Sequence, residues 1–160
     1  MLNRVARYRS LRGYDGVLAD SNMPDAVRFL FNVIGFQPPP NESGGAGSPV
    51  GARAARMSSI KISEGFNLGY CEALPGRGPM MHNHDTNETF ITMTGKWRAS
   101  WELENGEVEH VDLGPLDVIS FPPGAVRLPV ELHGAGGLRG LPHQHGEREW
   151  LAQCPSGPRF

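Results

Sequence analysis

The sequence contains only two cysteines in 160 residues, Cys71 and Cys154. Two cysteines so far apart form neither a disulfide framework nor the close pairs of a structural zinc site, so we expect a reduced, cytoplasmic protein. A long apolar run is also missing. The most apolar window, residues 26–36, is too short to cross a bilayer and contains a charged arginine. We therefore expect no membrane segment and interpret the basic residues 1–14 as mature protein.

A strong charge of one sign is absent as well. The formal net charge is −2, from 15 Lys and Arg against 17 Asp and Glu. The arginines gather in residues 1–14, whereas residues 15–126 are acidic overall. An acidic body disfavours nucleic acids and anionic membranes as partners. The sequence has no glycine-rich phosphate loop and no motif around a nucleophilic serine or cysteine.

Glycine and proline are abundant, with 21 and 14 residues respectively. Both destabilise helix interiors, so their number favours an all-β protein with many short strands and turns. The chain divides into an N-terminal arm (1–36), a Pro/Gly-rich loop (37–52), a strand-rich core (53–126) and an atypical C-terminal tail (127–160).

The core is predicted to form successive strands separated by turn residues. Asn105-Gly106 is typical of a two-residue hairpin loop. In the arm, Asp25 is a candidate N-cap and favours a short helix over a strand, although the β-branched and aromatic residues of 29–34 are also compatible with a strand. The predicted strands cover residues 56–62, 66–74, 88–94, 97–104, 107–113 and 118–121.

One segment carries a set of metal-ligating side chains. His82 and His84 are separated by one residue, so on a strand both imidazoles point to the same face. Glu88 follows after a short break, near the start of the next predicted strand. Two histidines and one carboxylate on one side form a facial three-ligand set for a divalent metal and leave coordination positions open. The alternative is a solvated polar loop with incidental histidines.

This segment resembles the first motif of the cupin family, in which two glycines frame the His-x-His pair and the glutamate. The second cupin motif is matched in its first half by Gly114 and by the turn 122–124, with a slightly long gap between them. The resemblance covers residues 53–126 and implies a double-stranded β-helix, or jelly-roll barrel, that commonly forms homodimers through its sheet faces. The matching residues of the first motif are Gly76, His82, His84, Glu88 and Gly95.

The resemblance places residue 127 at the position of a fourth metal ligand, normally a histidine. Arg127 stands there, and a guanidinium does not coordinate a cation. Three ligands can still hold a metal, with Fe(II) favoured over zinc, manganese and nickel. Arg127 is then a candidate for binding a substrate carboxylate or phosphate through two parallel hydrogen bonds. The alternatives are a structural arginine, or a weakened metal site in a barrel that only binds a ligand.

The tail does not follow the pattern of a barrel. Residues 127–160 contain ten glycines and prolines and show no clear alternation, so we expect an irregular tail. A reading-frame shift near codon 127 is one explanation for the abrupt loss of pattern, and an unusual tail that packs as coil is the other.

The resemblance implies a metal-dependent enzyme acting on a small organic substrate, with oxygenase, decarboxylase and isomerase chemistry all represented among such barrels. No residue is identified as a general acid or base, and Glu72 and Asp85 are the nearest candidates. The alternatives are a non-catalytic cupin that binds or senses a small ligand, and a structural cupin with an inert site. The apolar segment 26–36 requires cover, which further favours a homodimer.

Overall fold

The computed structural model describes residues 1–16, 18, 20, 22–35, 57–61, 66–132 and 149–155. The described residues form eight strands and three single-turn 3-10 helices. The helices cover Leu2–Arg4, Tyr8–Ser10 and Pro24–Ala26, all in the N-terminal arm. The strands are β1 (Arg28–Ile34), β2 (Leu68–Ala73), β3 (Glu88–Thr92), β4 (Lys96–Glu102), β5 (Val108–Leu113), β6 (Val118–Phe121), β7 (Arg127–Leu132) and β8 (Glu149–Pro155). The all-β prediction is confirmed.

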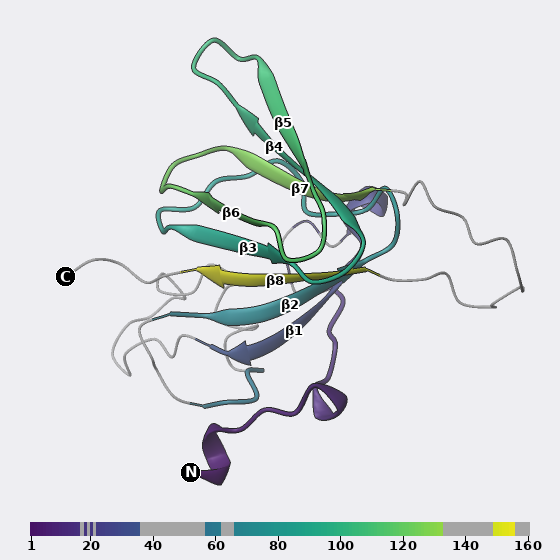
Figure 1. Cartoon of the computed structure of the whole chain (residues 1–160), viewed down its shortest axis with the longest axis vertical. Coiled ribbons are helices and arrows are strands. Elements are labelled where there is room, and N and C mark those ends of the chain that lie inside the picture. The colour runs from purple at the N-terminus through teal and green to yellow at the C-terminus, as the bar shows by residue number, and fades with distance from the viewer. Residues whose placement is uncertain are drawn as a thin grey trace, which may run out of the picture.

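The strands form two sheets. The larger sheet has the order β1-β2-β8-β3-β6, and the smaller one has the order β5-β4-β7. All the pairings within the two sheets are antiparallel. Figure 1 shows β8 lying between β2 and β3, and the β4–β5 hairpin projecting beyond the other strands. No strand pairing joins the two sheets among the described residues, so the barrel is not closed by hydrogen bonds.

The strands predicted from the sequence of the core agree closely with those of the structure. Residues 118–121 form β6 as predicted, and β2 to β5 differ from the predicted ranges by one or two residues at most of their ends. At the predicted hairpin, Gly106 adopts a φ of +82°, a left-handed conformation that favours glycine. The predicted strand at 56–62 is wrong over 57–61, where Ile60 forms only an isolated bridge to Ile34.

The helix expected in the arm is also wrong. Arg28–Ile34 form strand β1, because every residue from Arg28 to Asn32 pairs with a residue of β2. Leu30 and Val33 are buried within the chain itself. This burial removes one reason to expect a homodimer, and the dimer remains a prediction that a light-scattering measurement of mass would check.

The tail is not irregular throughout. Arg127–Leu132 form β7 and pair with β4, while Glu149–Pro155 form β8. The loop 37–52 lies outside the described residues, as do 133–148 and 156–160. The frame-shift hypothesis stays a prediction, and sequencing the DNA around codon 127 tests it.

The main core lies between the sheets. Trp97 of β4 is fully buried, and Trp101 of the same strand is partly buried beside Phe121 of β6, with ring centroids 6.4 Å apart. The core cluster contains Cys71, Ala73, Phe90, Trp97, Ala99, Leu113 and Phe121. Both tryptophans of β4 therefore contribute to the packing between the sheets.

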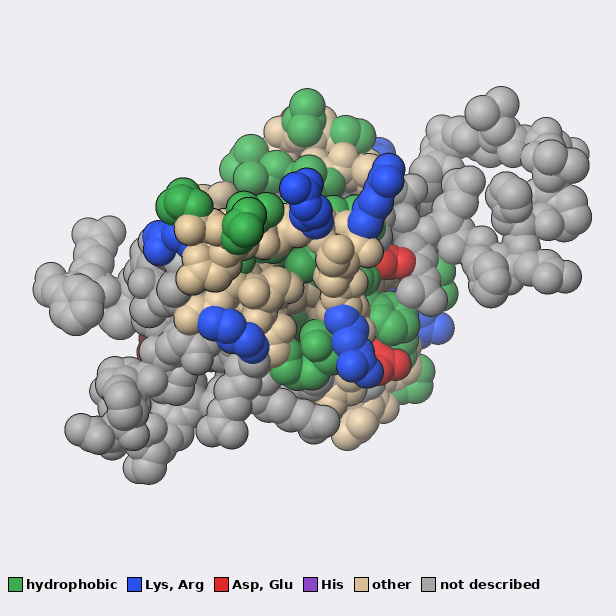
Figure 2. All heavy atoms as spheres, turned by 90° about the horizontal axis from the view of Figure 1, so that it is seen from below, with side chains coloured by type: hydrophobic (Ala, Val, Ile, Leu, Met, Phe, Trp, Pro, Cys, Tyr) green, Lys and Arg blue, Asp and Glu red, His purple; other side chains and the backbone are tan. Residues whose placement is uncertain are grey.

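Among the described residues, no helix is long and apolar enough to cross a membrane. On the face shown in Figure 2, the basic side chains stand apart from one another, with apolar side chains between them.

Trp97→Ala is expected to reduce the free energy of unfolding by about 3–5 kcal/mol, because it removes the largest fully buried side chain of the core. Urea denaturation followed by circular dichroism measures the change. Val118→Ala is the matched control, since Val118 is 58% exposed and its truncation should change stability by less than about 0.5 kcal/mol. Equal losses in the two variants would contradict this assignment of the core.

Candidate metal centre

The predicted ligands His82, His84 and Glu88 lie together in the structure. Each offers one ligand atom, and these three atoms lie within 4.8 Å of one another. The two imidazole rings meet edge to face, with centroids 5.0 Å apart. Three neutral or anionic donors at this separation can surround a divalent metal ion.

Backbone hydrogen bonds hold the loop that carries the histidines. His82 and Arg127 exchange two of them, one from His82 N to Arg127 O (3.1 Å) and one from Arg127 N to His82 O (2.9 Å). The amide of Gly124 donates to the carbonyl of His84 at 2.7 Å. Gly124 has a φ of +83°, so the turn of the second motif needs a glycine to present this amide. The two cupin-like motifs therefore meet at the site.

The imidazole of His82 is oriented by a second contact. Its Nδ1 lies 2.5 Å from the carbonyl oxygen of Met80, a pure acceptor, so Nδ1 carries the proton and Nε2 is left as the ligand atom. Burial lowers the pKa of His82, and the nearby Arg127 charge lowers it further. His82 is therefore held in the neutral form that binds a metal.

His84 is perturbed more strongly. Burial lowers its pKa to about 4, with further contributions from the charges of Arg127 and His82. Its Nε2 lies 3.8 Å from Glu88 Oε1. At neutral pH this imidazole is uncharged and offers a lone pair toward the same space as the carboxylate.

Glu88 is the first residue of β3 and is completely buried. Burial raises the pKa of this carboxyl group, and the charge of Arg127 acts in the opposite direction by favouring the carboxylate. Among the described residues, Oε1 of Glu88 has no hydrogen-bond partner, although it is buried. An unpartnered carboxylate oxygen in the interior is costly, and a cation between it and the imidazoles would satisfy it. The donor set thus fits a divalent metal.

Arg127 lies on the other side of the same carboxylate. Its side chain is 1% exposed, and Nε donates to Glu88 Oε2 at 2.8 Å while a second guanidinium nitrogen, Nη2, contacts the same oxygen. Nη1 donates to the carbonyls of His82 and Ala125, both at 3.3 Å. These contacts occupy four of the five N–H groups of the guanidinium. A bidentate contact between Arg127 and a substrate would therefore require it to release Glu88.

Sequence reasoning missed a second arginine at the site. Arg28 of β1 lines a cavity that also includes His82 and His84. The signal that could have revealed it is an arginine inside the apolar window 26–36, because a charged side chain in such a run needs a buried partner or a ligand.

Neither a protein-family model nor a curated protein sequence matches the chain. Solved structures do match. Peruvianin-I, described as a cysteine peptidase from Thevetia peruviana latex, aligns with a TM-score of 0.58 and 12% identity over 97% of this chain and 72% of its own.

Two enzymes align similarly. A mutant oxalate decarboxylase of Bacillus subtilis gives a TM-score of 0.56 and 15% identity over 95% of this chain and 29% of its own. HppE in its Fe(II) form, with an alternative substrate, aligns with a TM-score of 0.54 and 10% identity over 94% of this chain and 58% of its own. This chain therefore spans less than two thirds of both enzymes. At such identities the likeness shows the fold alone, and it confirms the predicted barrel.

Metal-free wild-type protein is expected to lose stability as the pH falls from about 6.5 toward 4. In that range the unfolded chain protonates His84, whereas the folded chain, whose His84 has a pKa of about 4, does not. Because the unfolded state then binds more protons, the free energy of unfolding decreases. Urea denaturation at several pH values measures this loss. His84→Gln should show a smaller loss over the same range, and identical pH dependence in the two proteins would contradict the burial of a neutral imidazole.

Arg127→Met is expected to cost about 3–5 kcal/mol of stability, because it leaves the buried carboxylate of Glu88 without its cation. The double variant Arg127→Met with Glu88→Gln should be more stable than Arg127→Met alone, since no unpaired buried charge remains. Urea denaturation of the two variants and the wild type gives the comparison. If the double variant is no more stable than Arg127→Met, the loss of stability does not come from leaving the Glu88 carboxylate unpaired.

Proposed function

We propose that this chain, a cupin by its fold, binds a divalent metal ion through His82, His84 and Glu88 and acts on a small organic substrate that carries a carboxylate. The observation that carries the proposal is the buried oxygen Oε1 of Glu88, which has no partner among the described residues and lies 3.8 Å from His84 Nε2. The two imidazoles, held neutral by burial, complete the donor set.

Fe(II) is the metal we favour, ahead of zinc, manganese and nickel. Two histidines and one carboxylate with open positions suit non-haem Fe(II) oxygenases, although the same donors also accept the other ions. The fold is shared with HppE, which was solved in its Fe(II) form. When bound, such an ion supplies Lewis acidity or a redox centre beside the substrate.

The chain's own residues prepare this site in three ways. Met80 O fixes the tautomer of His82 and thereby exposes Nε2. Arg127 holds Oε2 of Glu88, so that a single oxygen of the carboxylate faces the histidines. The burial of Glu88 and the partial burial of the two histidines lower the local dielectric, which strengthens electrostatic contacts with a substrate. We assign Arg127 a positioning role in this arrangement, in place of the direct substrate contact that sequence analysis predicts.

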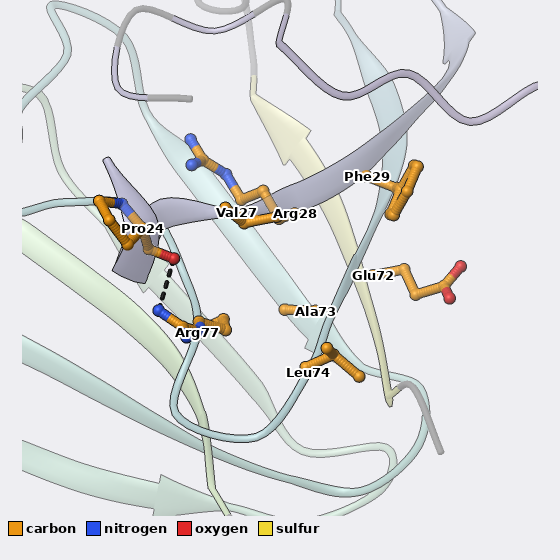
Figure 3. A pocket seen from close by; sticks show the side chains of 8 residues that line it. All are labelled: Pro24, Val27, Arg28, Phe29, Glu72, Ala73, Leu74 and Arg77. Atoms are coloured by element: carbon orange, nitrogen blue, oxygen red, sulfur yellow. Dashed lines mark hydrogen bonds between the residues drawn. The ribbon is translucent and has the colours of Figure 1, made fainter. Parts of the chain in front are cut away.

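A non-catalytic ligand-binding cupin is the second candidate. It is favoured by the placement of Glu72 and Asp85, the nearest candidates for a general acid or base. Asp85 is exposed to solvent, and Glu72 lines a different hollow with Phe29, Leu74 and Arg77, shown in Figure 3. Neither supplies a buried proton donor at the triad.

The peptidase description of Peruvianin-I finds no support at Cys71. This thiol is buried, and burial raises its pKa to about 11, so it is protonated and inaccessible at neutral pH.

Purified wild-type protein is expected to take up about one equivalent of Fe(II) or Zn(II), because the triad offers three preoriented donors. His82→Ala should lose most of this uptake, measured by elemental analysis after gel filtration. His110→Ala is the matched control, since His110 lies on the exposed strand β5 and should leave uptake unchanged. Equal metal content in wild type and His82→Ala would overturn the proposed site.

Oxygen uptake separates the two candidate functions. An Fe(II)-loaded oxygenase should consume dioxygen in the presence of at least one member of a panel of small carboxylates, and His82→Ala should not. An electrode recording of dioxygen, with product analysis by mass spectrometry, provides the measurement. Carboxylate binding without oxygen consumption or product formation would favour the non-catalytic candidate.

A further inference from the structure

A cavity opens beside the two histidines. Its volume is about 330 Å³, enough for a small organic molecule. One wall is the loop that carries the metal ligands, and the other comes from the N-terminal arm and from β1. The lining residues are Leu18, Asp20, Arg28, Met80, Met81, His82, Asn83 and His84. Arg28 and Asp20 are the charged groups in this lining.

Arg28 is a buried cation at this cavity. Its side chain is only 8% exposed. Nη2 donates to Asp20 Oδ1 at 2.9 Å, and Nη1 donates to the carbonyl of Ala26 at 2.8 Å. Among the described residues, these contacts use two of the five N–H groups of the guanidinium, which leaves others for a ligand. Figure 3 shows the guanidinium of Arg28 pointing away from Phe29 and Glu72, which lie together on the opposite side.

Asp20 holds this arginine and also the metal-ligand loop. Its Oδ1 accepts from Arg28, and its Oδ2 accepts from the backbone N–H of Met80 at 2.8 Å. The carbonyl of the same Met80 orients His82. A chain of hydrogen bonds therefore leads from Arg28 through Asp20 and Met80 to a metal ligand, so the spacing between guanidinium and metal donors is fixed by the fold.

The charges at the site favour an anionic ligand. Arg28 is balanced by Asp20, and Arg127 is balanced by Glu88. With these two pairs neutral, a bound divalent ion leaves a surplus of positive charge beside the cavity. Such a surplus attracts an anion, and an arginine fork binds a carboxylate through short, charge-assisted hydrogen bonds.

We propose that Arg28 anchors a carboxylate of the substrate while another part of the same substrate faces the metal donors. Asp20 is the positioning residue, which holds Arg28 and partly neutralises its positive charge. This inference rests on the proposed function, and it names the substrate class as compounds with a carboxylate at one end and a metal-binding group at the other. Specificity then depends on the N-terminal arm, outside the segment that carries the cupin-like motifs.

The test uses the full chain loaded with Zn(II) and two probes, succinate and its half-amide succinamate. Both offer one carboxylate to the metal, and only succinate offers a second to Arg28. Isothermal titration calorimetry should show wild type binding succinate about tenfold more tightly than succinamate. Arg28→Gln should reduce this ratio to about one, and Asp20→Asn should give an intermediate ratio, because its single amide oxygen cannot accept from both Arg28 and the Met80 N–H.

Two controls keep the result specific. Arg77→Gln removes an arginine that pairs with Asp25 and lies in the neighbouring hollow of Figure 3, so it should preserve the wild-type ratio. The double variant Asp20→Asn with Arg28→Gln carries neither buried charge, so it avoids the unpaired carboxylate that could unfold Arg28→Gln, and its ratio should also be about one. A wild-type ratio retained in that double variant, or lost in Arg77→Gln, would overturn the proposal.

Zinc uptake, measured first in every protein, separates the two levels of inference. If the wild type takes up zinc but its preference for succinate over succinamate does not depend on Arg28, the proposed anchor is overturned and the proposed metal site is retained. No zinc uptake by the wild type, together with Arg28-dependent binding of succinate to the metal-free protein, would overturn the proposed function and support an anion site at Arg28. If the wild type neither takes up zinc nor binds succinate through Arg28, the proposed function and the proposed anchor are both overturned.

Discussion

The buried pair between Arg127 and Glu88 is the interaction on which the site depends. Glu88 begins β3 of the larger sheet and Arg127 begins β7 of the smaller one, so the pair joins two sheets that share no strand pairing among the described residues. The same guanidinium also contacts the carbonyl of His82. Breaking the pair would therefore free the carboxylate and remove, at the same place, one contact of the histidine loop and one link between the sheets.

The ligand triad could be predicted because its information is local. His82, His84 and Glu88 lie within seven residues of one another, and strand periodicity with flanking turns places them on one side. The role of Arg127 could not be derived in the same way. Its partner is 39 positions distant, and only the register of the strands shows that the guanidinium faces Glu88. Arg28 depends on tertiary structure for the same reason, since it reaches the cavity only after the arm has folded against the sheet.

The strands missed at both ends of the chain show a similar limit. Segment 28–34 has a composition compatible with either a helix or a strand, and pairing with β2 decides the outcome. Segment 149–155 has little strand character of its own, but it lies between β2 and β3 and pairs with both. The core strands β4 and β5 were predictable because a short turn that contains Asn105-Gly106 joins them, so their pairing needs no distant partner.

The position of β8 has a consequence for how the protein is made. Its neighbours β2 and β3 are synthesised many residues earlier, and neither can complete its pairing until residues 149–155 have left the ribosome. The half-formed sheet then exposes two open edges next to the metal-ligand loop, and such edges favour aggregation. The larger sheet is therefore expected to form only after residues 149–155 have emerged, and the nascent chain to need protection from aggregation until then.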